Sequence, residues 1–174
     1  MPDRNEPRVR ADVTELFRQH HLELVRLAVL VVGDLATAED VVQDAFEQLH
    51  RRWHLLRRRD SALDYARSAV LNRCRSVHRR RGVARRYERQ AAGAAGLAGD
   101  PGTGDFGIAV EQRSELFTAF RVLPRRQREV LALRYYLDLS VADTASTLHI
   151  SEDAVRATAS RGLAALARIL RAQT

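Results

Sequence analysis

Apolar residues recur along the first half of this chain every three or four positions, the spacing that places them on one face of an α-helix. The first run covers residues 13–32 and is ended by Gly33. A second covers 37–53, with Thr37 as its side-chain cap, and a third covers about 63–81. The alternation typical of strands is absent. The pattern therefore predicts three helices in this half.

The same helical spacing continues in the second half. Residues 114–122 form a short amphipathic stretch, and Pro124 suits the first turn of a helix over 125–137. That helix is expected to bury Val130, Leu131 and Leu133, together with one of Tyr135 and Tyr136. The whole chain is therefore predicted to be all-α.

Two capped helices close the chain. Ser140 precedes a helix over 141–148, a tight turn follows at 149–150, and Ser151 precedes a helix over 152–170. This is the spacing of a helix-turn-helix, whose second helix enters the major groove of DNA. Its candidate DNA contacts are Ser151, Asp153, Arg156, Ser160 and Arg161. A generic helical hairpin is the alternative.

The glycines divide the chain. Seven of the nine lie between residues 82 and 107, in a stretch almost without large apolar side chains. Such a composition is typical of a flexible linker. We therefore expect two small helical domains, at 12–81 and 112–171, joined by a flexible linker at 82–111.

Composition excludes several classes of protein. The chain has 174 residues and a net charge of +7, and all 29 basic side chains are arginine. A single cysteine, Cys74, rules out a disulfide framework and makes a zinc site improbable. No apolar run approaches the roughly 18 residues of a membrane span, and residues 1–10 lack the apolar core of a signal peptide. We expect a cytoplasmic protein without cofactor, metal or enzymatic activity, since no nucleophile–base pair or phosphate-binding loop is visible.

The distribution of charge says more than its total. Residues 1–50 hold 5 Arg and 10 acids, a net charge of −5. Residues 51–90 hold 14 Arg and 3 acids, a net charge of +11. Residues 91–174 hold 10 Arg and 9 acids, close to neutral. An acidic segment beside a basic one suggests two different partners, although a solvated arginine-rich surface would also give this pattern.

The basic segment has the residue types that bind opened DNA. Asn72, Arg75 and Arg79 are three or four residues apart and share one helix face. Arginine interleaved with Trp53 and Tyr65 suits single-stranded bases, which stack on aromatic rings and guanidinium planes. For Trp53, packing in the core is an equally good interpretation.

Taken together, these segments resemble an RNA polymerase sigma factor of the extracytoplasmic-function (ECF) type, in its small actinobacterial-like branch. Residues 24–28, Gly33-Asp34 and residues 38–46 are similar to sigma region 2. Residues 123–131, 133–136 and 138–140 are similar to sigma region 4. The resemblance covers about 14–81 and 112–170, and it implies a region 2-like bundle and a region 4-like helix-turn-helix.

The resemblance also implies partners and site residues. Region 2 would dock on the β′ clamp of core RNA polymerase and bind the −10 promoter element as single-stranded DNA. Region 4 would bind the −35 element as duplex and touch the β flap. An anti-sigma factor is a further expected partner. The implied polymerase contacts are Asp40, Val42, Gln43, Asp44 and Phe46. The implied −10 contacts are Trp53, the loop at 54–62, Tyr65, Asn72, Arg75 and Arg79.

Some positions depart from the family pattern. His149 stands where the turn usually has Gly, Thr144 replaces a large aliphatic residue, and Thr158-Ala159 replace an Arg-Leu pair. We therefore expect weaker −35 recognition than is typical. Two alternatives remain open at this point: a stand-alone helix-turn-helix regulator, and a degenerate sigma-like interaction protein that does not recognise promoters.

Overall fold

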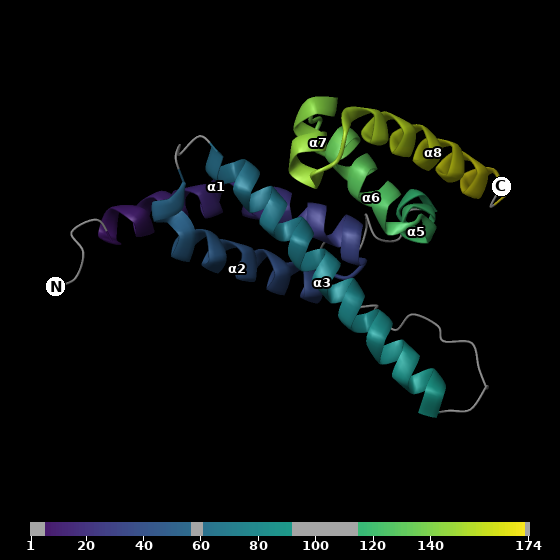
Figure 1. The fold of residues 1–174 in the computed structure, drawn as a ribbon, viewed down its shortest axis with the longest axis horizontal. Coiled ribbons are helices and arrows are strands. Elements are labelled where there is room, and N and C mark those ends of the chain that lie inside the picture. The colour runs from purple at the N-terminus through teal and green to yellow at the C-terminus, as the bar shows by residue number, and fades with distance from the viewer. Residues whose placement is uncertain (1–5, 57–60, 92–114, 173–174) are drawn as a thin grey trace.

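Every regular element of the described chain is helical. The computed structural model describes residues 6–56, 61–91 and 115–172 (Figure 1). The predicted linker therefore lies largely outside the described residues, as does part of the 54–62 loop. Within the described ranges the all-α prediction is confirmed.

The first three helices form a bundle, which we call the N-terminal unit. It consists of α1 (Glu6–Val32), α2 (Leu35–Arg52) and α3 (Ala62–Ala91), with the short 3-10 turn η1 (Trp53–Leu55) after α2. The apolar stripe predicted for the second helix is buried, and each such side chain contributes about 1.5–3 kcal/mol to folding. It comprises Val42, Ala45, Phe46, Leu49 and Trp53.

The cap of α2 is Asp34, so the prediction of Thr37 as its cap is wrong. Gly33 has a φ of 92° and ends α1. The next residue, Asp34, is extended, and its carboxylate accepts a hydrogen bond from the Thr37 backbone amide at 2.8 Å. Arg81 of α3 donates to the same carboxylate, also at 2.8 Å. Although burial raises the pKa of Asp34, these hydrogen bonds outweigh it and lower the pKa.

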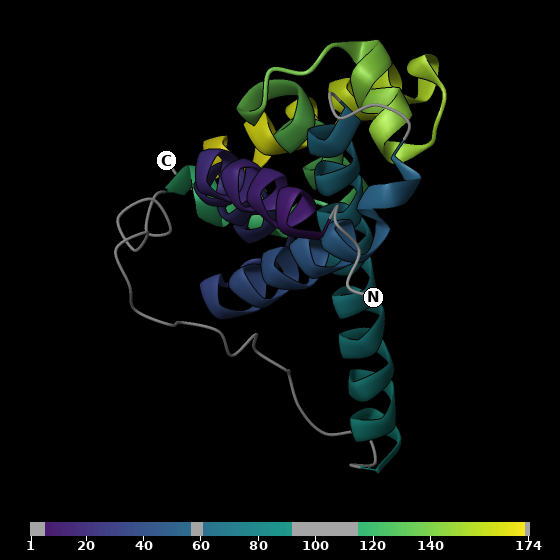
Figure 2. The same cartoon turned by 90° about the vertical axis from the view of Figure 1, so that its left-hand side faces the viewer.

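Helix α3 is longer than predicted. It continues past Arg81 to Ala91, so ten residues of the predicted linker are helical. Its buried side ends near Cys74, and the last turns project beyond the rest of the molecule (Figure 2). The sequence signal failed here because residues 82–91 have no apolar stripe, and a lone Gly82 does not stop an arginine-rich helix.

The remaining helices form the C-terminal unit. They are α5 (Glu115–Val122), α6 (Arg125–Leu131), the π-helical turn η3 (Ala132–Tyr136), α7 (Val141–Leu148) and α8 (Glu152–Arg171). Both predicted serine caps are confirmed: Ser140 accepts from the Asp143 amide and Ser151 from the Ala154 amide. The helices α7 and α8 are joined by a tight turn at His149, whose φ of 54° is left-handed. This is the predicted helix-turn-helix.

The π-helical turn changes which side chains are buried. Leu133 is fully buried, but Tyr135 and Tyr136 are 59% and 38% exposed, so the expectation that one of them is buried is wrong. A π turn inserts one extra residue and shifts the side chains that follow. Its five-residue hydrogen bond joins the Leu137 amide to the Ala132 carbonyl at 3.1 Å.

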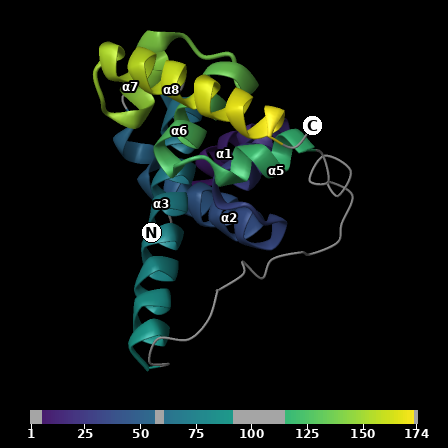
Figure 3. The ribbon, with the colours of Figure 1, turned by 90° about the vertical axis from the view of Figure 1, so that its right-hand side faces the viewer.

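The two units pack against each other in one compact molecule. The C-terminal unit lies across α1 and α3, with η3, α5 and α6 against α1 and α7 against α3 (Figures 1 and 3). Buried apolar residues of both units belong to one continuous cluster. The junction between the units is therefore part of the fold, and its polar contacts decide which functional faces are accessible.

Candidate polymerase and nucleic-acid interfaces

One side of α2 is an exposed acidic face. Because its apolar stripe is turned into the bundle, the polar residues at helical spacing face solvent. They are Glu39, Asp40, Gln43, Asp44 and Glu47, and we call them the acidic face. Asp44 meets Arg73 of α3 at 3.5 Å, and Glu47 meets Arg51 at 3.5 Å. Exposed pairs of this kind are weak, so the face can exchange them for a basic partner.

Two of the five residues predicted to contact polymerase lie elsewhere. Val42 is fully buried and Phe46 is 6% exposed. The Phe46 ring packs edge-on against Phe17 of α1, with their centroids 4.9 Å apart. These two side chains hold α2 on the bundle and present the acidic face indirectly. Asp40, Gln43 and Asp44 lie on the surface, as predicted.

Three of the residues predicted to bind the −10 element follow one line along α3. Tyr65, Asn72 and Arg79 are seven residues apart, which places them on one side of a helix. Asn72 and Arg79 are exposed, whereas Tyr65 is half-buried and its hydroxyl accepts a hydrogen bond from Gln48 at 3.1 Å. Trp53 is only 9% exposed and lies in the core, as in the alternative interpretation.

The first half of this line borders the C-terminal unit. A cleft of about 470 Å³ separates α3 from α7. Its walls include Gln48, Tyr65 and Asn72 on one side and Asp143, Thr147 and His149 on the other. The Ser68 hydroxyl donates to the Thr147 carbonyl oxygen at 3.5 Å. In this arrangement a DNA strand would reach half-buried Tyr65 only through the cleft, whereas Asn72 is exposed at its edge.

The strongest polar contact between the units involves Arg75, another predicted −10 contact. Its Nε and Nη2 donate to the two carboxylate oxygens of Glu129 in α6, at 3.1 and 3.2 Å. Glu129 is fully buried and also meets Arg126 at 2.9 Å and Arg125 at 3.4 Å. A bidentate pair with a desolvated carboxylate is among the stronger ion pairs in proteins. Arg75 is thus committed to the C-terminal unit.

The pKa values of two side chains near this junction are shifted by burial and by the charges around them. Burial, with the nearby Glu129 carboxylate second, raises the pKa of the Cys74 thiol to about 12. His78 donates from Nε2 to the Val31 carbonyl oxygen at 3.0 Å. Burial, followed by the charges of Arg128, Arg125 and Arg81, lowers the pKa of His78 although that hydrogen bond opposes the change. Neutral forms are favoured at both sites.

The recognition face of α8 is, by contrast, open. All five predicted −35 contacts are exposed: Ser151, Asp153, Arg156, Ser160 and Arg161. Arg156 is held by Glu152 at 2.7 Å and by Asp153 at 3.0 Å, within its own helix. The Ser151 hydroxyl caps the helix. The structure therefore brings these residues together on one accessible face.

The unusual residues of the helix-turn-helix lie mostly in its core. Thr144, Thr158 and Ala159 are 0%, 7% and 9% exposed. The Thr144 hydroxyl oxygen has no hydrogen-bond partner in the described chain. Helix α8 approaches α6 so closely that a Cβ on Gly162 would lie 3.0 Å from a methyl carbon of Leu131. These substitutions therefore act on packing, and His149 alone among them faces solvent.

Two residues that tie distant parts of the chain together were not predicted. Glu129 stands next to the apolar run 130–133, and a carboxylate at such a position signals a buried charge that needs partners. The sequence cannot tell that one partner is Arg75, 54 residues away. Arg81 is the last of three consecutive arginines at the end of the predicted third helix, and its guanidinium ties α3 to Asp34 and Thr37.

Some kinds of site are not found in the described residues. No group of three or more His, Cys, Asp or Glu side chains is arranged to hold a metal ion in the ranges 6–56, 61–91 and 115–172. Across the same ranges, no helix combines the length and the apolar character needed to cross a bilayer.

Comparison with known families matches both units. The family described as Sigma-70 region 2 matches residues 16–84. The family described as Sigma-70, region 4 matches residues 113–166. The two matches correspond to α1–α3 and to α5–α8, and both families occur in the order that the sequence predicts.

The similarity to curated relatives extends over most of the chain. The ECF RNA polymerase sigma factor SigM of Mycobacterium tuberculosis is 31% identical over 156 residues, which cover 90% of this chain and 76% of that protein. The RNA polymerase sigma-E factor of Streptomyces coelicolor is 28% identical over 155 residues, covering 87% of this chain and 82% of that protein. The similarity therefore spans both units.

A solved structure has the same fold. It is the sigma factor RpoE of Bartonella quintana, crystallised with the anti-sigma factor NepR. The TM-score is 0.71 at 20% sequence identity, and the match covers 92% of this chain and 97% of that one. At this identity the likeness concerns the fold.

Proposed function

The chain belongs to the ECF branch of the sigma-70 family, the RNA polymerase sigma factors that direct transcription initiation, and we propose which of its surfaces carries each part of that work. The family is not enzymatic, and its members bind core RNA polymerase and promoter DNA. The observation that carries the proposal is the separation of an acidic face on α2, an arginine-rich face on α3 and an exposed recognition face on α8 of a single compact molecule. This function is exercised in the cytoplasm, where polymerase and promoter meet.

The acidic face of α2 binds core polymerase. Asp40, Gln43 and Asp44 supply exposed acceptors for basic side chains, and buried Val42 and Phe46 hold the helix in place beneath them. The test is pull-down of core polymerase by Asp40→Arg, with Glu15→Arg on exposed α1 as the control for charge reversal. Loss of core binding by Asp40→Arg alone is expected. Equal binding by both variants would contradict the assignment.

The line along α3 binds the opened −10 element. Unstacking a base costs a few kcal/mol, and stacking on a protein side chain returns roughly 1–3 kcal/mol per base, so a few contacts decide where the duplex opens. Tyr65 offers a ring, Asn72 can pair with a base edge, and Arg75 and Arg79 offer guanidinium groups. Trp53 supports this surface from within the core.

The exposed face of α8 binds the −35 element as duplex. Arginine can pair bidentately with guanine, and Arg156 and Arg161 lie on the exposed side of the helix. Arg156 makes weak exposed pairs, and Arg161 donates to the Ala157 carbonyl oxygen and the Thr158 hydroxyl. Phosphate or base contacts can therefore replace them at little cost.

Binding of the −10 element requires the two units to separate. In the compact molecule Arg75 holds Glu129, and α7 borders the cleft in front of Tyr65 and Asn72. The Nε and Nη2 donors of Arg75 cannot bind Glu129 and a DNA phosphate at the same time. The units proposed to move are 12–81 with its helical extension and 112–171, joined through the chain between them.

An anti-sigma factor is the further partner that we propose. The structure of Bartonella quintana RpoE contains one, and this chain shares its fold. A protein that stabilises the junction between the units would keep the −10 surface covered. Affinity purification of the chain from its own cells tests this: a stoichiometric helical partner that blocks core binding is expected, and purification of the chain with core polymerase alone would contradict it.

Runoff transcription with core polymerase tests the function as a whole. Promoter-specific transcripts are expected with the native chain and none with Asp40→Arg. A stand-alone regulator would bind promoter duplex and give no transcripts. A degenerate interaction protein would bind core polymerase, give no transcripts, and bind duplex DNA no worse after Arg156→Ala. Either result would overturn the proposal.

A further inference from the structure

The arginines of α3 fall into two groups. The first group is engaged with acids of other helices or their caps: Arg67 with Glu23, Arg73 with Asp44, Arg75 with Glu129 and Arg81 with Asp34. Arg79, Arg80 and Arg86 are exposed, and no hydrogen bond or ion pair of theirs is found within the described part of the chain. The first group holds the fold together. The second group has no task in the fold, and all its members lie toward the free end of the helix.

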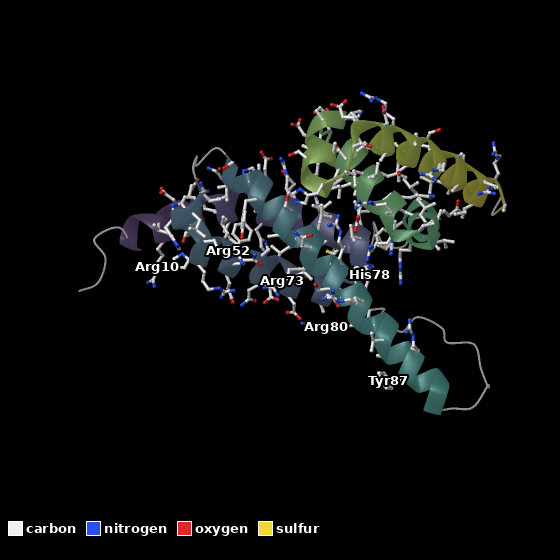
Figure 4. All side chains as sticks on the ribbon, in the orientation of Figure 1. Arg10, Arg52, Arg73, His78, Arg80 and Tyr87 are labelled. Carbon is white, nitrogen blue, oxygen red and sulfur yellow. The ribbon has the colours of Figure 1, made fainter. Side chains whose placement is uncertain are left out.

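That end of α3 projects from the molecule as an arm. Val83 and Tyr87 are 47% and 69% exposed, and a Cβ added to Gly82 would meet no atom within 4 Å. Figure 4 shows Arg80 where α3 leaves the bundle and Tyr87 further out along it. Figures 1 and 3 place α8 on the opposite side of the molecule. We call residues 80–87 the arm.

The direction of the arm is fixed by Arg81. Its guanidinium donates to the Asp34 carboxylate and the Thr37 hydroxyl, both at 2.8 Å, and to the Val32 carbonyl oxygen at 3.3 Å. At 3.6 residues per turn, Arg79, Val83 and Arg86 lie on the side of the helix facing away from this anchor. The arm is therefore anchored at its base and has a basic outer face.

This outer face continues the −10 surface. Tyr65, Asn72, Arg79 and Arg86 are spaced by seven residues and lie on one line. At about 1.5 Å per residue, Arg86 lies about 10 Å beyond Arg79, the last residue of the −10 surface, along the helix axis. DNA rises about 3.4 Å per base pair, so this distance corresponds to roughly three base pairs. The C-terminal unit covers Ser68 and the Asn72 side of the line but leaves the arm clear.

We propose that the arm binds the phosphate backbone of double-stranded DNA over the roughly three base pairs immediately upstream of the −10 element. This inference rests on the proposed function, which places the −10 element along Tyr65, Asn72 and Arg79. The end of α3 that leads to the C-terminal unit is the upstream end, since that unit binds the −35 element. Free arginines along a helix match a row of phosphates in charge and give affinity without sequence preference. Because the arm stays clear, it can hold duplex DNA before the units separate.

Fork-junction probes bound by the reconstituted holoenzyme test the proposal. Each probe carries a single-stranded −10 element and no −35 element, with either a short upstream duplex of about two base pairs or a long one of about twelve. The test variant is Arg80→Ala with Arg86→Ala, which spares every residue assigned to the −10 surface. The matched control is Arg10→Ala with Arg18→Ala, two exposed arginines of α1.

The native holoenzyme and the control are expected to bind the long probe more tightly than the short one. The test variant should lose roughly tenfold in affinity for the long probe at low salt and almost nothing for the short one. Its slope of log affinity against log salt concentration should be smaller by about 2, one for each arginine removed. Equal binding by the test variant and the control would overturn the proposal.

Equal losses on both probes would also overturn it, because the arm would then hold the polymerase and not upstream DNA. If the native holoenzyme binds neither probe, the proposed function itself fails and this inference fails with it. Binding of both probes with no gain from the longer duplex overturns the arm alone. The two failures are therefore distinguishable.

A single attached cleavage reagent maps the contact directly. The chain's one cysteine, Cys74, is fully buried, so Val83→Cys provides a unique reactive site on the arm for an iron–EDTA conjugate. Cleavage is expected within the roughly three base pairs upstream of the −10 element. Cleavage confined to the −35 element or to the opened strand, or none at all, would contradict the proposal.

Discussion

The faces of α3 and α8 that are proposed to bind DNA both carry arginine, but these arginines are neutralised in different ways. On α8, Arg156 is neutralised by Glu152 and Asp153 of its own helix, and its side chain stays 57% exposed. On α3, Arg75 is neutralised by Glu129 of the other unit, which is fully buried. The first arrangement leaves a face ready for duplex DNA. The second makes access to the −10 face depend on the position of the other unit.

This difference has a physical reason. Exposed pairs within one helix contribute little and are screened by salt, so phosphates can displace them. A buried carboxylate shared by three arginines is desolvated, and removing one partner leaves uncompensated charge. The −35 face can therefore be engaged in the compact molecule. The −10 face has to be released from Glu129 first.

The largest expected effect is that of Glu129→Ala. This variant leaves Arg75, Arg125 and Arg126 around a site that has lost its carboxylate. Breaking a buried ionic cluster in this way costs about 3–5 kcal/mol, which lowers the melting temperature by roughly 6–20 °C for a chain of this size. Thermal unfolding measures the change. Glu115→Ala, an exposed acid of α5, is the control and should unfold like the native chain.

A smaller effect is expected on the open face. Arg156→Ala should weaken binding of the −35 duplex by about 1–3 kcal/mol and relax the base preference at one position. Binding of a single-stranded −10 probe by the holoenzyme should stay unchanged. Fluorescence anisotropy with the two probes measures both. A loss on the −10 probe as large as on the duplex would remove the distinction between the faces.

The contact between the units is tested by Arg75→Met, which keeps the alkyl stem and deletes the charge. Glu129 retains Arg125 and Arg126, so we expect a loss of only about 1 kcal/mol in the free energy of unfolding. Amide hydrogen exchange should accelerate in α7 and at the facing side of α3. Unchanged exchange there would mean that Arg75 does not hold the units together.

The smallest effect concerns pH. Burial and three nearby arginines lower the pKa of His78, so the folded chain resists protonation below the ordinary histidine pKa of about 6.5. Below that pH the unfolded chain binds a proton that the folded chain does not, and the free energy of unfolding decreases as pH falls. Melting temperatures of the native chain and His78→Gln should diverge between about pH 7 and 5. Parallel curves would contradict this.

Local signals in the sequence predicted much of the fold. Apolar spacing of 3.6 located α2, whose stripe from Val42 to Trp53 is buried, and the serines at 140 and 151 located the caps of α7 and α8. These signals depend on neighbours within a few residues. The exposed acidic and recognition faces followed from the same periodicity, because burial of one side leaves the other side to solvent.

Features that depend on distant residues could not be predicted. Nothing near Glu129 indicates that Arg75 completes its site, and nothing near Thr37 shows that Asp34 is shared with Arg81. The π-helical turn that exposes Tyr135 and Tyr136 has no periodic signature. Trp53 was ambiguous for another reason, because an aromatic residue among arginines is compatible with both base stacking and core packing.

The distance between α3 and α7 tests most directly whether the −10 face is covered until the units separate. Spin labels at Asp64→Cys and Ala142→Cys, both exposed positions, report it by pulsed electron resonance, and buried Cys74 stays unlabelled. The free chain should give one short, narrow distance. The holoenzyme bound to a fork-junction probe should give a longer one. A short distance that persists while the −10 strand is bound would contradict the account.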